Sequence, residues 1–250
     1  MQSRRFMIPA IVIGRKGSKG FPGKNFHPIL GKPLCWYPMN AALQSRFVNQ
    51  VFLSTNDPKL VNIAKPLGLK IIDRPANLCT DKALGEDVFK HGFEEIKKVE
   101  FPARVEMIVL LFCNAPMATA KAIDAGIRFL RKNPNLDSAV TVSKYNMWSP
   151  LRARKIARNH CLKPFIPFQA FGDPRKLTCD RDSQGDVWFA DMSVSVVRPR
   201  CLERIEEGLL PQKWMGKKTF PIKQEGGLDV DYAWQIPYVV DWIRRYKKIN

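Results

Sequence analysis

Four glycines recur at every third position near the start of the chain, with basic side chains among them. The glycines are Gly14, Gly17, Gly20 and Gly23, and the basic residues are Arg15, Lys16, Lys19 and Lys24. A glycine-dense segment can turn its backbone N–H groups inward without Cβ clashes, and basic side chains add charge-assisted hydrogen bonds to phosphate oxygens. The segment follows an apolar run at residues 7–13, at the carboxyl end of an expected strand, where open α/β sheets bind ligands. This pattern predicts a triphosphate site.

Two better-known phosphate loops are excluded by counting. A Walker loop needs Lys-Ser or Lys-Thr directly after a glycine that lies five positions beyond another, and the positions five beyond Gly14 and Gly17 hold Lys19 and Pro22. A dinucleotide fingerprint needs two glycines separated by one residue, and residues 14–23 contain no such pair. A solvated basic turn is the plain alternative, and the place of the glycines at a strand end argues against it.

Near the other end of the chain, Asp229 and Asp231 flank Val230. Residues two apart in an extended segment project to the same side, so both carboxylates can face one Mg²⁺ ion. Such an ion would bridge phosphate oxygens and neutralise their charge. The alternative is that one aspartate caps the helix expected to follow, which is a common place for aspartate.

The composition is strongly basic, with a formal net charge of +18 over 250 residues. This excess attracts nucleotides, acidic sugars and nucleic acid alike, so it does not choose among anions, and runs such as residues 152–155 are typical of solvated faces. No nucleic-acid partner is expected. The six cysteines show no zinc or disulfide spacing, and the chain has neither a leader-like start nor an apolar run of 18 residues. A soluble, cytoplasmic protein without a membrane partner is expected.

Strand-like and helical runs alternate along most of the chain, which predicts an α/β fold with a doubly wound, mostly parallel sheet in a single domain over residues 1–250. Strands are expected at 7–13, 50–55, 69–72, 107–112, 138–143, 192–197 and 219–222. Helices are expected at 33–45, 60–67, 84–98, 118–133, 201–207 and 232–246. Residues 144–190 lose this periodicity and predict an irregular excursion from the sheet.

The glycine segment resembles the signature of the acylneuraminate cytidylyltransferases, the family similar to CMP-sialic acid synthetases. The likeness lies in Arg15-Lys16-Gly17-Ser18-Lys19-Gly20-Phe21-Pro22-Gly23-Lys24-Asn25, then Gly31-Lys32-Pro33-Leu34, Asp73-Arg74-Pro75-Ala76-Asn77-Leu78 and Asp229-Val230-Asp231. It implies a Rossmann-like nucleotidyltransferase fold that uses CTP and Mg²⁺ to activate an acidic 3-deoxy-2-keto sugar, a sialic acid-like nonulosonic acid, and releases pyrophosphate. It also implies a homodimer in which residues 144–190 form the dimerisation arm.

The resemblance also implies roles for individual residues. The expected nucleotide-binding residues are Arg15, Gly17, Ser18, Lys19, Lys24, Asn25, Arg74 and Asp81. The expected catalytic residues are Lys24, Arg15, Asp229 and Asp231, with the last two as metal ligands, and Arg181 is the candidate for the sugar. For Asp81, capping of the helix expected from residue 84 is an almost equally good explanation. Turn and cap roles are favoured for Ser54, Asn56 and Asp57.

This chain departs from the family where the sugar should bind. Relatives carry Gln-Pro-Thr-Ser-Pro-Leu-Arg after the central strand, and residues 112–118 here are Phe-Cys-Asn-Ala-Pro-Met-Ala. The family's Arg-Pro-Asn-Gly-Ala stretch is replaced by Phe189-Ala190-Asp191-Met192-Ser193. The particular sugar therefore stays open, and a non-sialic nonulosonic or an octulosonic acid is an alternative.

Two other classes of function stay open at this point. The first is a glycosyltransferase that holds the metal of a nucleotide sugar with Asp229-Val230-Asp231 as its D-x-D motif, although that motif usually lies mid-domain. The second is a non-catalytic anion-binding protein on the same scaffold, which would bind polyanions with steep salt dependence and show no turnover.

Overall fold

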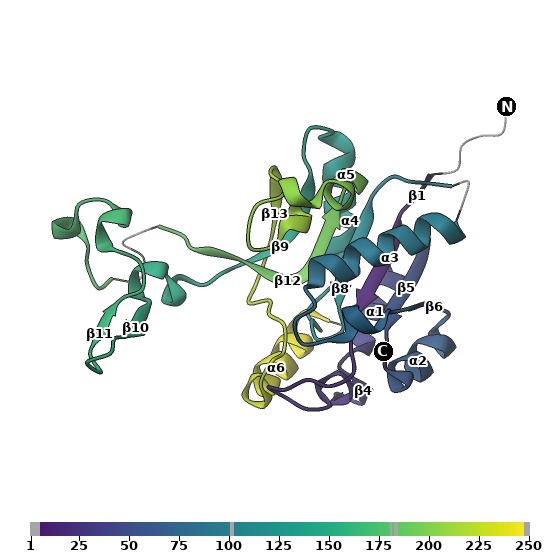
Figure 1. Ribbon diagram of the computed structural model, residues 1–250, viewed down its shortest axis with the longest axis horizontal. Coiled ribbons are helices and arrows are strands. Elements are labelled where there is room, and N and C mark those ends of the chain that lie inside the picture. Colours follow the sequence, from purple (N-terminus) through teal and green to yellow (C-terminus); the bar gives the residue numbers. More distant parts are fainter. Residues whose placement is uncertain (1–5, 101–102, 181, 183–184, 248–250) are drawn as a thin grey trace.

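A seven-stranded sheet runs through the protein in a computed structural model that describes residues 6–100, 103–180, 182 and 185–247 (Figure 1). Its strand order is β13-β9-β12-β8-β2-β5-β6. The strands are β2 (Pro9–Ile13), β5 (Gln50–Thr55), β6 (Lys70–Asp73), β8 (Ile108–Phe112), β9 (Ser138–Lys144), β12 (Trp188–Val197) and β13 (Thr219–Gln224). β12 is antiparallel to both of its neighbours, and the other pairs are parallel. The expected mostly parallel α/β sheet is confirmed.

Helices cover both faces of this sheet. α1 (Trp36–Leu43), α2 (Pro58–Ala64) and α4 (Ala120–Lys132) pack on one face, and α3 (Gly85–Val99) and α5 (Pro199–Glu203) pack on the other. Strand β2 shows how one segment serves both layers, because Ala10 and Val12 enter the first core while Ile11 and Ile13 enter the second. α6 (Ile236–Tyr246) closes a third core with the short hairpin β3 (Pro28–Ile29) and β4 (Lys32–Pro33).

Each expected strand and helix has a counterpart, with corrections at their ends. The first helix begins at Trp36 rather than at residue 33, because Pro33 belongs to β4. The first strand is split into β1 (Phe6–Met7), which pairs with β7 (Arg104–Val105), and β2. β12 begins at Trp188 rather than at residue 192, and its register with β9 shifts between Ala190 and Ser195. That bulge breaks the alternation that marks a strand in the sequence.

The described residues between β9 and β12, which are 145–180, 182 and 185–187, leave the sheet and project from the body of the protein (Figure 1). The projection contains the hairpin of β10 (Arg154–Ile156) and β11 (Leu162–Pro164), joined to the body by short 3₁₀ turns. Large apolar side chains on it are exposed, among them Trp148, Ile156 and Leu162. The irregular excursion expected at residues 144–190 thus has the shape of an arm.

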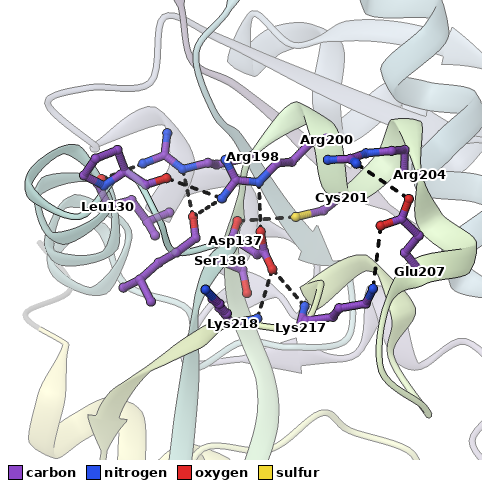
Figure 2. Close-up of polar contacts among 12 residues, drawn as sticks. Leu130, Asp137, Ser138, Arg198, Arg200, Cys201, Arg204, Glu207, Lys217 and Lys218 are labelled. Carbon is purple, nitrogen blue, oxygen red and sulfur yellow. Dashed lines mark hydrogen bonds and ion pairs between the residues drawn. The ribbon is translucent and has the colours of Figure 1, made fainter.

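Asp137, just before β9, joins three segments at the end of the sheet opposite the glycine-rich loop (Figure 2). Its carboxylate accepts hydrogen bonds from the backbone N–H groups of Lys217 and Lys218, both at 2.9 Å, and from Arg200 Nε at 2.8 Å. Beside it, Arg198 donates to the carbonyl of Leu130 at the end of α4. Burial raises the pKa of Asp137, but these hydrogen bonds outweigh it and hold the pKa below its ordinary value.

Within the part of the chain that the structure describes, none of the helices combines the length and the apolar character needed to cross a membrane.

Candidate active site

A cleft of about 200 Å³ opens at the carboxyl ends of β2 and β8, and Arg74, just beyond β6, also lines it. The expected site residues in its lining are Arg15, Gly17, Ser18, Lys24, Asn25 and Arg74. Unexpected residues also line it, including Leu78, Gly85, Phe112 and Asn114. Parallel strands bring these segments together because their carboxyl ends meet at one edge of the sheet.

The glycine-rich loop is fastened to its neighbours through the backbone. Gly14 donates its N–H to the carbonyl of Ser54 at 3.2 Å, and Lys16 donates its N–H to Asn56 Oδ1 at 3.0 Å. A Cβ on Gly14 would lie 2.5 Å from Cys113 Sγ, so the loop can pack against the end of β8 only with glycine there. Asn56 thus fastens the glycine-rich loop to the end of β5.

A second glycine, Gly20, allows the basic loop to approach the acidic segment closely. A Cβ on Gly20 would lie 2.8 Å from the carbonyl oxygen of Asp231. The basic loop and the acidic segment therefore touch through their backbones. Sequence analysis placed both in one site, and the structure brings them together.

Two loop cations are held by one carboxylate. Arg15 Nη2 lies 2.7 Å from Asp81 Oδ1, and Lys19 Nζ lies 2.5 Å from Asp81 Oδ2. The bonds from Lys19 and then Arg15 lower the pKa of Asp81. Leu84 is the N-cap of α3 and no side chain bonds there, so the alternative that Asp81 caps this helix is wrong. Asp57, in contrast, does cap α2, with Oδ1 accepting from Lys59 N–H at 3.0 Å.

The ammonium group of Lys24 forms an ion pair with the acidic segment. Its Nζ lies 2.5 Å from Asp231 Oδ1, and the Lys24 side chain is 12% exposed. Lys24 opens a 3₁₀ turn (Lys24–Phe26) whose buried Asn25 accepts the N–H of Cys35 through its carbonyl. The turn fixes the stem of Lys24 while its charged end faces the cleft.

Asn114 joins the two acidic side chains, and sequence analysis missed this role. Its Nδ2 lies 3.3 Å from Asp229 Oδ2 and 3.5 Å from Asp231 Oδ1, so both carboxylates face the same point. Its carbonyl accepts the N–H of buried Val230 at 2.7 Å. The available signal was a polar residue just beyond the most apolar strand, the position where ligand-facing side chains gather.

Electrostatics make this acidic corner receptive to a cation. Burial and then the charge of Asp231 raise the pKa of Asp229, while Lys24 and Asn114 act in the opposite direction. Neither aspartate caps a helix: α6 begins at Ile236, and Gln235 Oε1 accepts the N–H of Asp231 at 2.7 Å. Among the described residues, no group of three or more His, Cys, Asp or Glu side chains is arranged to hold a metal ion.

Arg74 faces the protein backbone. Its Nη2 donates to the carbonyls of Gly14 at 3.1 Å and Ser54 at 2.5 Å, and its Nε donates to Ser54 Oγ at 3.3 Å. Burial lowers its pKa. The geometry makes it a clamp between β2 and β5 at the cleft wall. Arg181, the candidate for the sugar, lies outside the described residues.

A doubly wound sheet with a basic, glycine-rich cleft at the carboxyl ends of its parallel strands is typical of α/β proteins that hold phosphorylated ligands. The family model for cytidylyltransferases matches residues 9–163, well over half of the chain. The chain belongs to this family, and its relatives are of the acylneuraminate type recognised from the glycine segment.

Three curated relatives illustrate the match. N-acylneuraminate cytidylyltransferase of Escherichia coli is 30% identical over 142 residues, which are 57% of this chain and 32% of the relative. N-acylneuraminate cytidylyltransferase A of Danio rerio is 23% identical over 94% of this chain and 49% of its own length. Pseudaminic acid cytidylyltransferase of Campylobacter jejuni is 28% identical over 54% of this chain and 58% of its own. The chain thus spans less than two thirds of the length of each.

Solved structures share the fold over nearly the whole chain. CMP:2-keto-3-deoxy-manno-octonic acid synthetase complexed with CTP has a TM-score of 0.65 at 17% identity, with 96% of this chain and 99% of that chain covered. A 4-diphosphocytidyl-2C-methyl-D-erythritol synthase from Anaerococcus prevotii has a TM-score of 0.59 at 12% identity, with 96% of each chain covered. At these identities the likeness establishes the fold.

Proposed function

We propose that this protein transfers the CMP group of CTP to the anomeric hydroxyl of an acidic 3-deoxy-2-keto sugar of the nonulosonic acid class and releases pyrophosphate. The observation that carries the proposal is the meeting of Lys24, Asn114 and the Asp229–Asp231 pair at the rim of a glycine-rich cleft. The names of the relatives supply the nucleotide and the class of sugar.

The loop would hold the triphosphate by exchange of partners. Arg15 and Lys19 are paired with Asp81, which keeps both cations extended beside the cleft. Phosphate oxygens can replace carboxylate oxygens on the same N–H donors, since both are charged acceptors. Gly17 and Ser18 line the cleft and can add backbone contacts. Arg74 would act as a support for the loop.

The acidic pair fits Mg²⁺. Mg²⁺ usually takes one or two carboxylates and completes its shell with water and substrate phosphates, so a two-carboxylate corner is sufficient. Burial and then the charge of Asp231 raise the pKa of Asp229, and a bound cation would offset both effects. When bound, Mg²⁺ would supply charge neutralisation to the phosphates. Asp229 and Asp231 would be its protein ligands, and Asn114 would keep both oxygens turned toward it.

In the proposed reaction the sugar hydroxyl oxygen attacks the α-phosphorus and loses its proton to water, and the bond from that phosphorus to the oxygen bridging to the β-phosphate breaks. Lys24 lies where it can leave Asp231 and neutralise charge on the departing pyrophosphate. Binding both substrates in one cleft aligns the hydroxyl with the bond that breaks.

The test is a substrate matrix. The protein is incubated with Mg²⁺, each of the four nucleoside triphosphates, and a panel of nonulosonic and octulosonic acids, while pyrophosphate is measured. We expect release only when CTP and a suitable sugar acid are both present. Release from free CTP also excludes a sugar-transferring enzyme, which would need a nucleotide sugar. Absence of pyrophosphate with every pair of substrates would reject the proposal. The remaining alternative would then be a non-catalytic anion-binding protein.

We further propose that the protein works as a homodimer through its arm, in the cytoplasm. Exposed Trp148, Ile156 and Leu162 give the arm an apolar surface that a second copy could cover. All six cysteines are unpaired, as is typical of a reducing compartment. Sedimentation should give a dimer, and Ile156→Asp combined with Leu162→Asp should give a monomer. A wild-type monomer at micromolar concentration would contradict this.

A further inference from the structure

The segment that carries the two acidic residues is tied down by side chains on its way from β13 to α6. Trp242 Nε1 donates to the carbonyl of Glu225, and Tyr238 Oη donates to that of Gly226 at 2.9 Å. Tyr145 Oη donates to the carbonyl of Gly227, also at 2.9 Å. Each of the three successive carbonyls of residues 225–227 therefore accepts a side-chain hydrogen bond before the chain reaches Asp229.

The N–H of Gly227 has a more unusual partner. It donates to Ser143 Oγ at 2.8 Å, and Ser143 Oγ donates in turn to Asp191 Oδ2 at 2.7 Å. A hydroxyl has one hydrogen, so giving it to a carboxylate leaves its lone pairs facing the glycine N–H. Asp191 is only 4% exposed and therefore directs the serine from inside the protein. A hydrogen bond to a carboxylate is stronger than one between neutral groups.

Gly227 lies directly against this pair. A Cβ there would lie 2.5 Å from Asp191 Oδ2 and 2.2 Å from Gln224 Nε2. Gln224 Nε2 also donates to Asp191 Oδ2, at 2.9 Å. The acidic segment thus passes over a buried carboxylate at van der Waals distance, two residues before Asp229.

The bulge in β12 delivers Asp191 to this place. The backbone turns at Met192, whose φ is +62°, and register with β9 is lost between Ala190 and Ser195. Asp191 Oδ1 then accepts from Thr141 Oγ1 at 2.6 Å and from the N–H of Ser193 at 3.1 Å. Bulges re-aim a side chain next to active sites, and this one turns an aspartate into the sheet beneath the acidic segment.

We propose that Asp191, acting through Ser143, is a positioning residue that sets the place of Asp229 and Asp231 by holding Gly227. The inference rests on the proposed function in one respect: the expected effect on Mg²⁺ binding assumes that those two carboxylates bind the ion. The hydrogen-bonded relay itself does not depend on which reaction is catalysed.

The test compares substitutions of the two hydroxyl residues that donate to the Asp191 carboxylate. Ser143→Ala removes a 2.7 Å bond to Asp191 together with the acceptor for Gly227. Thr141→Val removes a 2.6 Å bond to Asp191 together with the acceptor for the N–H of Val194, and neither bond leads to Gly227. Asp191→Asn is the third variant, because it keeps the shape and removes the charge. Thermal unfolding of each variant confirms that it is folded.

The first measurement is hydrogen exchange of the peptide covering residues 225–231, which reports local opening. A lost hydrogen bond of about 1 kcal/mol corresponds to about a fivefold faster exchange. We expect this change in Ser143→Ala and Asp191→Asn, with Thr141→Val within about twofold of wild type. Equal exchange in Ser143→Ala and Thr141→Val would overturn the inference.

The second measurement is Mg²⁺ dependence, by calorimetry and by the Mg²⁺ concentration that gives half-maximal pyrophosphate release. We expect a rise of about fivefold in Ser143→Ala and little change in Thr141→Val. If hydrogen exchange is faster in Ser143→Ala but the wild-type protein shows no turnover, the proposed function is rejected and the relay is supported. Normal wild-type turnover with identical Mg²⁺ dependence in both variants would reject the relay's role and keep the function.

Discussion

Lys24 and Asp231 stand 207 positions apart in the chain, and their side chains meet at 2.5 Å between Nζ and Oδ1. One belongs to the turn after the glycine-rich loop and the other to the segment before α6. The contact places a positive charge beside a carboxylate pair at the rim of the cleft. This is the arrangement that phosphoryl-transfer chemistry requires, in which a cation and a metal-binding corner share the charge of the phosphates.

Removing either member of this contact should stop turnover. We expect Lys24→Ala and Asp231→Ala each to lower the rate of pyrophosphate release by about 100-fold or more, because each removes a charge aimed at the phosphates. Circular dichroism and thermal unfolding should stay near wild type. The matched control is Lys16→Ala, which removes an exposed loop cation and should keep most activity. Near-normal rates in both test variants would remove the site assignment.

Gly20 should be required for activity more than for stability. A Cβ at this position would push against the carbonyl of Asp231, so Gly20→Ala should displace the acidic segment and lower activity about 100-fold. Gly68 gives the opposite case, since its φ is +80° and no atom lies within 4 Å of a built Cβ. We expect Gly68→Ala to lower the free energy of unfolding by about 1 kcal/mol with normal turnover. Steady-state rates and urea unfolding of both variants test the contrast.

Leu30 offers a stabilising change in a hairpin turn. It lies with Gly31 in the two-residue hairpin between β3 and β4, and both have positive φ, at 46° and 79°. Such a turn favours Asn-Gly, and a left-handed leucine costs about 1–2 kcal/mol. Leu30 is 37% exposed, so its replacement gives up only part of the apolar burial of a core leucine. Leu30→Asn should raise the free energy of unfolding by about 0.5–1 kcal/mol in urea titrations. A lower midpoint would show that leucine packing outweighs the strain.

Asp137 should make the free energy of unfolding depend on pH in the acid range. Its pKa is depressed below the ordinary 3.8 in the folded protein, so its stabilising effect is complete above that value and is lost as the pH falls through the folded pKa. We expect Asp137→Asn to cost about 2 kcal/mol at pH 7, because an amide group would face three N–H donors (Figure 2). The difference from wild type should shrink in unfolding measured near pH 3.

The neighbouring Glu207 provides the control for that measurement. It pairs with Arg204 and Lys217 at the surface, at 3.6 and 3.7 Å. Exposed ion pairs contribute less than about 1 kcal/mol, so Glu207→Gln should change stability little at either pH. A similar loss in both variants would contradict a special role for Asp137.

Local pattern determined much of the fold. The continuous apolar runs at residues 7–13 and 107–112 predict strands buried on both faces, and their β2 and β8 counterparts supply both cores. Asp57 before Pro58 predicts the start of α2, which is where the helix begins. The sequence also places the glycine loop at a strand end, because glycine spacing and a preceding apolar run are both local signals.

The sequence by itself therefore determined the α/β fold, its elements and the residue types of the candidate site, since these follow from periodicity and motif spacing within short windows. Only the tertiary structure decided which partners those residues have. Asp81 holds two cations instead of capping α3, Arg74 clamps carbonyls, and Asn114 joins Asp229 to Asp231. The bulge that buries Asp191 under Gly227 was equally hidden. Such contacts depend on strand register and on the packing of distant segments, and neither leaves a mark in local sequence.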